Sequence, residues 1–235
     1  MTIQDQREDV HGHSGWLIPL GLACAILLLS GIFLGWYLRP GPRIAQATDK
    51  ATMVALTVGG VSFIIPANFI QNPAARAGGE QGAVTLAALF PSWRGYSDAD
   101  AKLFAGNAPD SPVIRLSLRG NAGNLSAADR LERIYLPYVT DANGTGGPFE
   151  LTQYGFRTDS GYVRNELFAG HATSGPVLLL CEKEAPDLPS PNCIAVERPI
   201  AKGLTLSYRF KRAYLARWRE MAAGAETLAR KFEKL

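Results

Sequence analysis

Few side chains in this sequence could carry out catalysis, and they do not form a known arrangement. A serine hydrolase combines a nucleophile, a general base and an acid that orients the base. His171 is the only histidine in the second half of the chain, and the nearest candidate partners in sequence are Asp159, Ser160 and Ser174. The chain has no Gly-x-Ser-x-Gly turn, which exposes the nucleophile of many hydrolases. We therefore interpret His171 as an ordinary loop residue.

Metal and phosphate chemistry are also poorly represented. His11 and His13 form a His-x-His pair that could bind a metal, but they lie in a short polar tail. The glycines of residues 144–147 are not followed by the Gly-Lys-Ser/Thr of a phosphate-binding loop. The acids of residues 182–187 are typical of a solvated loop. We therefore predict no cofactor, no metal site and no catalytic residue.

Two cysteines, Cys181 and Cys193, are placed where a disulfide could form. The intervening residues 182–192 contain three prolines and three acids, and apolar, strand-like runs flank them on both sides. Two cysteines near the ends of a hairpin could close this loop, and such a bond would contribute about 3 kcal/mol on the chain-entropy model. Disulfides persist in the periplasm or outside the cell. The alternative is a pair of unpaired buried thiols.

The loop at residues 90–96, with the sequence FPSWRGY, is the best candidate for an interaction site. Trp, Tyr and Arg are the residue types that dominate interface hot spots. A turn that presents Trp93, Arg94 and Tyr96 together could dock a partner. The alternative is that these aromatic side chains fold back over the core.

One uncharged stretch, residues 16–38, must position everything that follows it. As a helix rising about 1.5 Å per residue, it is long enough to cross a hydrocarbon core of about 30 Å. Trp16 and Trp36 lie at its two ends, as in the aromatic belts of membrane proteins. We predict a transmembrane helix that contacts the lipid bilayer, preceded by a polar tail at residues 1–15 and followed by a linker at residues 39–50.

Two other interpretations of this stretch are weaker. A cleaved signal has an apolar core of roughly 7–15 residues followed closely by a small-x-small site, whereas the small-x-small triplet here lies at residues 45–47, well beyond the apolar run. Cys24 could be read as a lipidated cysteine, but the apolar run continues past it. We therefore interpret Cys24 as a packing residue of the helix.

Gly31 and Gly35 form a GxxxG pair within this helix. Two glycines four residues apart lie on one face and let a second backbone approach closely. They predict self-association or pairing with another membrane helix. The alternative is that glycine is simply common in membrane helices.

The orientation in the membrane depends on two opposing signals. Arg39, Arg43 and Lys50 follow the apolar stretch, while only Arg7 precedes it, and the positive-inside rule then favours a cytoplasmic domain. That rule is weak for a long translocated domain, and the cysteine pair favours an oxidising compartment. We predict a single-pass protein of the inner (plasma) membrane whose C-terminal domain lies in the periplasm or outside the cell.

Residues 51–235 are enough for one domain with a substantial core. Short apolar runs punctuated by Gly and Pro predict a mainly antiparallel sheet. The predicted strands are residues 52–58, 61–65, 83–90, 113–119, 149–156, 162–169, 176–181, 193–197 and 204–210. Short helices are predicted at residues 97–105 and 126–136.

A long amphipathic helix is predicted from residue 211 to the end of the chain. Its apolar stripe comprises Leu215, Trp218, Ala222, Ala225, Ala229 and Phe232. An alanine-rich stripe is typical of a helix packed on protein, so we expect it to dock on the sheet. The fold class is thus α+β. A helix lying on anionic lipid headgroups is the alternative.

The charge distribution does not indicate nucleic-acid binding. The formal charge is +3, and the basic excess is confined to residues 209–235, where eight Lys or Arg face three Glu. We therefore predict a non-enzymatic, membrane-anchored interaction or accessory subunit of an envelope or membrane complex, with a protein partner. The alternatives are an anchored small-molecule sensor, with a pocket near Asn68, Gln71 and Arg76, and an anchored hydrolase that uses His171.

Overall fold

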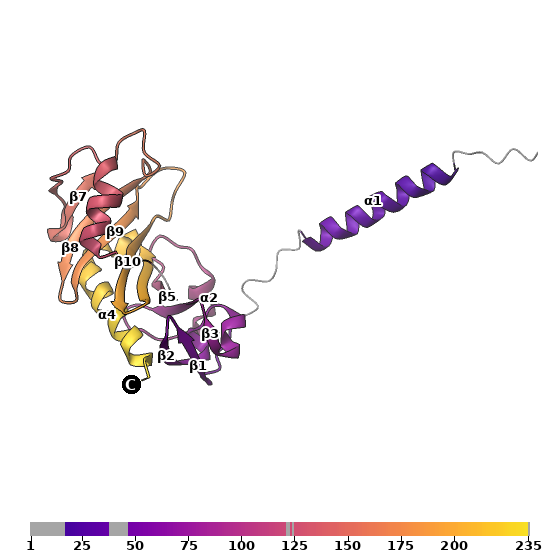
Figure 1. Cartoon of the computed structure of the whole chain (residues 1–235), viewed down its shortest axis with the longest axis horizontal. Coiled ribbons are helices and arrows are strands. Elements are labelled where there is room, and N and C mark those ends of the chain that lie inside the picture. The colour runs from indigo at the N-terminus through magenta and orange to yellow at the C-terminus, as the bar shows by residue number, and fades with distance from the viewer. Residues whose placement is uncertain (1–16, 38–46, 121–122, 124, 235) are drawn as a thin grey trace, which may run out of the picture. The chain divides into compact units, whose positions relative to one another are not determined.

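A computed structural model of the chain describes residues 17–37, 47–120, 123 and 125–234 (Figure 1). The chain divides into two compact units, Met1–Ala45 and Gln46–Leu235, and each is considered by itself. His11, His13 and Trp16, on which several predictions rest, lie outside the described residues, as do Arg39 and Arg43.

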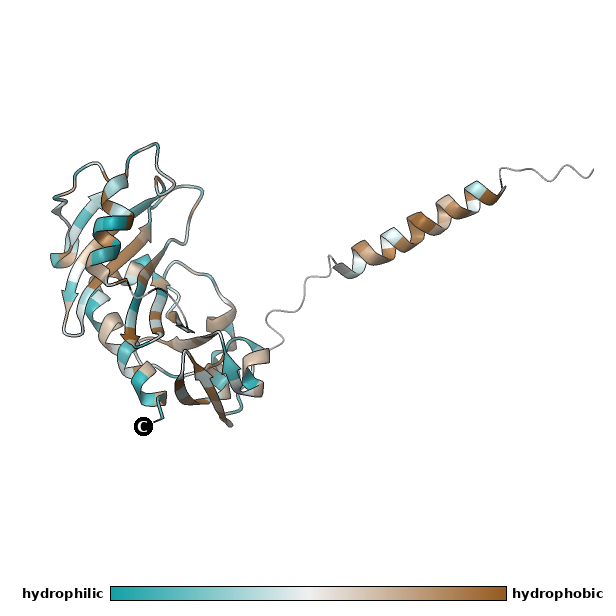
Figure 2. Ribbon diagram, viewed as in Figure 1, coloured by the Kyte–Doolittle hydropathy of each residue, from teal (hydrophilic) through white to brown (hydrophobic). Residues whose placement is uncertain are grey.

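The first unit contains one described element, helix α1 (Leu17–Tyr37). Within the described chain it is the one helix that is long and apolar enough to cross a membrane, with a mean hydropathy of 2.3 over Ile18–Trp36. None of that span is buried against protein, and Figure 2 shows it as a largely apolar rod. No heavy atom lies within 4 Å of a Cβ built on Gly31 or Gly35. Their role in helix pairing, and the membrane crossing itself, stay predictions.

The second unit is organised on an eight-stranded sheet in the order β4-β5-β11-β10-β9-β8-β7-β6. Its strands are β4 (Ala83–Leu89), β5 (Val113–Gly120), β6 (Thr145–Gly146), β7 (Thr152–Gly155), β8 (Asn165–Ala172), β9 (Gly175–Glu182), β10 (Asn192–Ala201) and β11 (Leu204–Lys211). Every neighbouring pair is antiparallel. Strands β6 to β11 form a meander, and β5 and then β4 extend the sheet beyond β11. This arrangement confirms the mainly antiparallel α+β fold.

A second, three-stranded sheet has the order β2-β1-β3, formed by β1 (Met53–Val58), β2 (Val61–Pro66) and β3 (Gly79–Gln81). The strands predicted at residues 52–58 and 61–65 are confirmed and form the β1–β2 hairpin, whose two turn glycines have φ values of 58° and 82°, which only glycine adopts without strain. Strand β3 pairs in parallel with β1. No strand was predicted there, because three mostly exposed residues carry no apolar alternation.

One face of the large sheet is covered by helix α4 (Trp218–Phe232). The predicted stripe is buried, and Trp218 is completely inaccessible. The docking of a C-terminal amphipathic helix is therefore confirmed. The predicted start at residue 211 was too early for an α-helix, because Arg212–Arg217 form a 3-10 turn. At its far end the helix reaches the small sheet, where Phe232 packs edge-on against Phe69 with ring centroids 5.0 Å apart.

On the opposite face, one helical segment packs near each end of the sheet. At the β7–β9 end, α3 (Ala127–Arg130) begins with a capping box. It continues as a π-helical turn (Leu131–Tyr135) and a 3-10 turn (Leu136–Tyr138). This segment packs on an apolar cluster of its own, separate from the main core. The sequence predicted one continuous helix there. At the β4 end, Phe104 of α2 (Ala101–Ala105) packs on Ala87, Leu89 and Val113.

Between these two helical segments, this face of the sheet carries a strip of exposed and half-buried residues. We call it the central strip and define it as Arg115, Ser117, Ile194, Ser207 and Arg209. These residues come from β5, β10 and β11, and the strand register places them on one face. All five are exposed or half-buried.

Candidate interaction site

The predicted disulfide between Cys181 and Cys193 is present. The two residues are directly opposite each other in β9 and β10, with Cα atoms 4.0 Å apart, and both are fully buried. Antiparallel register brings two residues together in this way when the intervening loop closes symmetrically. The bond therefore closes the base of the loop at residues 182–192.

Hydrogen bonds within this loop add to the restraint of the disulfide. The Glu182 carboxylate accepts from the backbone N–H of Asn192 at 2.7 Å and from its side-chain amide at 3.0 Å. At the outer part of the loop, Asp187 forms an ion pair with Arg164 at 2.8 Å. The hydrogen bond and charge of Arg164 hold the pKa of Asp187 below its ordinary value. A loop held at both its base and its tip is preorganised, which lowers the entropy that binding would cost.

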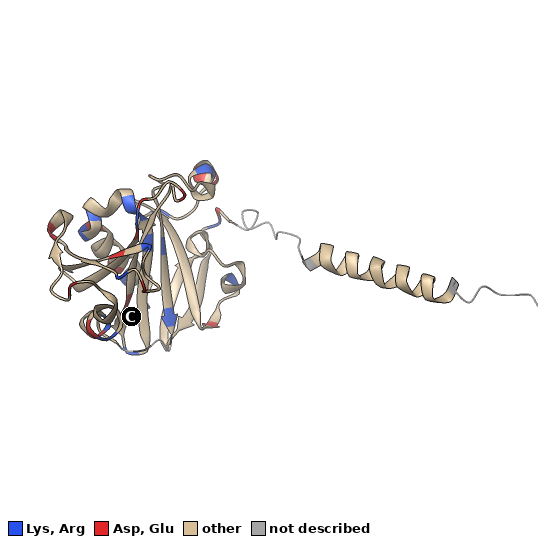
Figure 3. Cartoon of the chain, turned by 90° about the horizontal axis from the view of Figure 1, so that it is seen from above, with Lys and Arg blue, Asp and Glu red and all other residues tan. Residues whose placement is uncertain are grey.

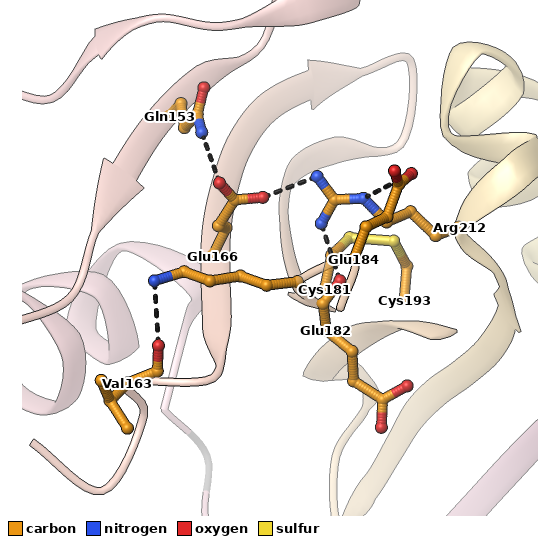
Figure 4. Close-up of polar contacts among 9 residues, drawn as sticks. Gln153, Val163, Glu166, Cys181, Glu182, Glu184, Cys193 and Arg212 are labelled. Carbon is orange, nitrogen blue, oxygen red and sulfur yellow. Dashed lines mark hydrogen bonds and ion pairs between the residues drawn. A yellow bond between two sulfur atoms is a disulfide. The ribbon is translucent and has the colours of Figure 1, made fainter. Parts of the chain in front are cut away.

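Arg212 connects the base of the loop to the sheet (Figure 4). Its guanidinium donates to the Glu182 backbone carbonyl at 2.8 Å and to the Glu166 carboxylate at 2.6 Å, and it lies 3.9 Å from Glu184. Gln153 donates to the other oxygen of Glu166 at 3.0 Å. Charge-assisted bonds of this kind are short and directional. The network fixes the loop relative to strands β7, β8 and β9.

A cavity of about 510 Å³ lies beside this loop. Its lining is mostly apolar and rich in proline, and consists of Pro109, Glu184, Ala185, Pro186, Leu188, Pro189, Pro191 and Ala213. Proline has no N–H to donate, so this surface offers shape and apolar contact rather than hydrogen-bond donors. It could accommodate an apolar side chain of a partner.

The predicted interface loop lies elsewhere, next to helix α4. Trp93 is half-buried and packs on the helix, where a Cβ added to Gly224 would meet the Trp93 indole ring. Tyr96 packs edge-on against Phe104 with ring centroids 5.3 Å apart. Arg94 is exposed and lies 3.5 Å from Asp100. The two aromatic side chains thus contribute to packing, and the contact of this loop with a partner stays a prediction.

The structure does not bring the candidate catalytic residues together. His171 is an exposed residue at the end of β8, opposite Pro176. The Ser160 hydroxyl donates to a backbone carbonyl at 2.8 Å, the Ser174 hydroxyl accepts from Arg198 at 3.3 Å, and Asp159 pairs with Arg157 at 3.1 Å. No hydrogen bond links His171 to a serine or a carboxylate in the part of the chain that the structure describes.

The polar residues suggested for a small-molecule pocket serve the fold instead. The Asn68 amide donates to the Tyr96 carbonyl at 3.0 Å, and the Arg76 guanidinium donates to the Ile70 carbonyl at 2.7 Å. Gln71 is exposed. Across the described ranges, no three His, Cys, Asp or Glu side chains gather as metal ligands would.

Comparison with known proteins identifies a likeness in fold. No family model and no curated protein matches the sequence. A solved structure described as an immunity protein of the Stenotrophomonas maltophilia type IV secretion system matches with a TM-score of 0.55 and 16% identity. The fold resembles that of this immunity protein. The match covers 83% of this chain and 98% of that one, and at this identity the likeness concerns the fold alone.

Proposed function

We propose that this chain is a membrane-anchored, extracytoplasmic protein that works by binding a protein partner. The observation that carries the proposal is the match to a secretion-system immunity protein over 98% of that protein's length. An immunity protein acts by binding rather than by transforming a substrate. The rigid, disulfide-closed loop and its apolar cavity supply a preorganised surface of the kind that binding requires.

Two further features support the proposed location. Helix α1 has the length and hydropathy of a membrane anchor, and a buried disulfide is stable in an oxidising compartment. A domain held at the outer face of the inner membrane would meet a protein as it arrives in the envelope. We therefore propose that the partner is a toxic protein delivered by a neighbouring cell.

A contact-competition experiment tests this function. Cells lacking the chain are mixed on a solid surface with a competitor that has an active secretion system, and with the same competitor after its secretion channel is inactivated. We expect the deletion strain to lose viability only beside the active competitor, and the full-length chain to restore survival. Equal survival of the deletion and parental strains beside every competitor tried would refute the proposal.

Binding is measured separately from protection. The full-length, affinity-tagged chain is purified in mild detergent from cells recovered from the competition, and co-purifying proteins are identified by mass spectrometry. The supporting result is recovery of a protein encoded by the active competitor and absent when its channel is inactivated. Recovery of envelope proteins of the host alone would instead indicate an accessory subunit.

A further inference from the structure

Arg115 and Arg209 face each other on adjacent strands of the large sheet. They are direct partners in the β5–β11 register, on the face that carries the central strip. Like charges at directly opposite positions destabilise a sheet. Burial, and then the charge of Arg209, lower the pKa of Arg115, so the pair carries an electrostatic cost in the free protein.

No carboxylate offsets this cost. Among the residues that the structure describes, neither guanidinium has a hydrogen bond or an ion pair. Elsewhere the domain pairs its arginines closely with acids: Arg198 lies 2.7 Å from Glu226, and Arg219 lies 2.6 Å from Glu150. Two unpaired arginines on neighbouring interior strands of a sheet are therefore an exception among the described residues.

A third cation, Lys211, extends the positive charge along the same face. It is only 5% exposed, and its ammonium group donates to the Asn107 side chain at 2.7 Å and to the Ser190 carbonyl at 3.2 Å. Burial, followed by the charge of Arg209, lowers its pKa. Both of its hydrogen-bond acceptors are neutral, and of the charged groups that act on its pKa, Arg209 and Arg115 are basic and Glu182 is acidic. Figure 3 shows basic residues on the strands of the sheet as well as on the helices of the domain.

The surroundings of the two arginines define what could bind. Ser117 and Ser207 are also direct register partners, one pair further along the same strands. Ile194 lies opposite Arg209 on β10 and is 43% exposed. Two forked donors and two hydroxyls suit carboxylates, and the isoleucine suits a neighbouring apolar side chain.

We propose that the central strip is the docking surface for an acidic, partly apolar segment of the protein partner. This inference rests on the proposed function and specifies the surface that performs it. The segment's carboxylates would neutralise Arg115 and Arg209, and its apolar residues would cover Ile194.

The charges around the strip favour a protein segment over a membrane or a nucleic acid. Glu182 and Glu197 lie on the same face, on either side of the strip. Glu197 is held there by Arg130 at 3.3 Å and by the hydroxyl of Thr205 at 3.1 Å. A membrane or a nucleic acid presents an extended anionic surface, which both acids would repel. A few carboxylates on one protein segment can instead lie between the two acids.

The test uses the full-length chain in detergent micelles and a fluorescein-labelled peptide of alternating Glu and Val. Fluorescence anisotropy reports binding at constant ionic strength, and empty micelles provide the background. We expect saturable binding that falls at least about tenfold in the double variant Arg115→Gln/Arg209→Gln, since the charge-assisted hydrogen bonds of both guanidinium groups would be lost. A peptide of alternating Lys and Val should not bind.

A matched control removes two arginines from elsewhere on the domain. Arg133 and Arg157 have side chains that are 69% and 48% exposed and pair with acids near them in sequence. The variant Arg133→Gln/Arg157→Gln should bind the Glu-Val peptide as the parent does. If this control loses as much binding as Arg115→Gln/Arg209→Gln, which we call the strip variant, the net charge of the domain alone explains peptide binding and the proposal is wrong.

Thermal unfolding provides a readout that does not depend on a ligand. Because Arg115 and Arg209 repel each other, Arg209→Gln should raise the melting temperature of the free protein. If the pair instead served the fold, that substitution would lower the melting temperature, and the proposal would be wrong. The proposal would also be wrong if phosphatidylglycerol vesicles or inorganic phosphate bound the parent protein more tightly than Arg115→Gln/Arg209→Gln, while the Glu-Val peptide bound both proteins equally.

The competition experiment separates this inference from the function beneath it. If the full-length chain protects and Arg115→Gln/Arg209→Gln protects equally well, the strip is not the docking surface but the proposed function stands. If the parental chain itself gives no protection, the proposed function is wrong, whatever the result of the peptide-binding assay. Protection that is lost in the strip variant and kept in the control variant supports both.

Discussion

Trp93 illustrates how a single residue can be shared between a loop and a helix. Its backbone has a φ of 53°, which is unfavourable for a bulky residue, and its indole ring lies against Gly224 of α4. Only a residue without a Cβ leaves room for that ring. Gly224 therefore provides the space for the ring, although glycine has a low helix propensity.

The first prediction tests this contact with a double-mutant cycle. In an exposed helix, Gly→Ala stabilises by up to about 1 kcal/mol. Here Gly224→Ala should instead lower the melting temperature, because the new methyl group would overlap the Trp93 ring. In the Trp93→Ala background the same substitution should become neutral or stabilising. Equal effects in both backgrounds, measured by thermal denaturation, would show that the two residues do not interact.

Glu226 sets part of the response to acid. Burial acts to raise the pKa of its carboxyl, but hydrogen bonds from Arg230, Arg198 and Ser174 outweigh burial and leave the pKa below its ordinary value. A carboxyl with a depressed pKa stabilises the fold at neutral pH. That contribution is lost as the pH falls below about 4.3 and through the folded-state value.

The second prediction follows from the lowered pKa of Glu226. Glu226→Gln should lower the denaturation midpoint at pH 7 and have a smaller effect near pH 3, where the parent has also lost the charge. Glu132→Gln serves as the control, because Glu132 is exposed and makes no ion pair within the described chain. A Glu226→Gln effect that is constant across this pH range would contradict the assignment.

At the scale of elements, the sequence predicted best where one segment carries its own pattern. The alternation of β5, the glycine turn between β1 and β2, and the apolar stripe of α4 each report local geometry. The cysteine pair was also visible, because both partners border one short loop. Strand β3 and the π-helical turn after α3 were missed, because three polar residues and a locally widened helix have no periodic signature.

The central strip could not have been predicted from these local patterns. Arg115 alternates with the apolar residues of its own strand, but its partner Arg209 lies on a strand far along the chain. Their pairing depends on β11 inserting between β5 and β10, and the sequence contains no local signal for that order. Register between distant strands is set by the packing of the whole sheet.

The third prediction concerns α4 as an element. Trp218 is fully buried, and its indole N–H donates to the Phe149 carbonyl at 3.1 Å. Trp218→Ala should therefore destabilise the domain by about 3–5 kcal/mol or prevent folding. Charge reversal of Arg217 and Arg219, whose side chains are 41% and 48% exposed, should cost less. Melting curves and sedimentation with anionic vesicles distinguish docking on the sheet from membrane-surface binding, which would reverse this order.

At the scale of the whole molecule, the main question is the side of the membrane on which the domain lies. The fourth prediction is that alkaline phosphatase, fused through a linker after Leu235, is active in a bacterial host, because this enzyme requires an oxidising compartment to form its disulfides. A reporter that is active only in the cytoplasm should be silent at the same position. The reverse pair of activities would place the domain in the cytoplasm.

The contact between the end of the chain and the first hairpin has a consequence for the order of events in the cell. Glu233 bridges to Phe63, and the Lys234 N–H donates to the Ser62 carbonyl at 2.9 Å. Residues 233 and 234 are synthesised after all the described strands. The first hairpin therefore lacks this contact until residue 234 has left the ribosome. Until then the contact between residues 233–234 and β2 is missing, so the domain cannot complete its fold while it is being synthesised.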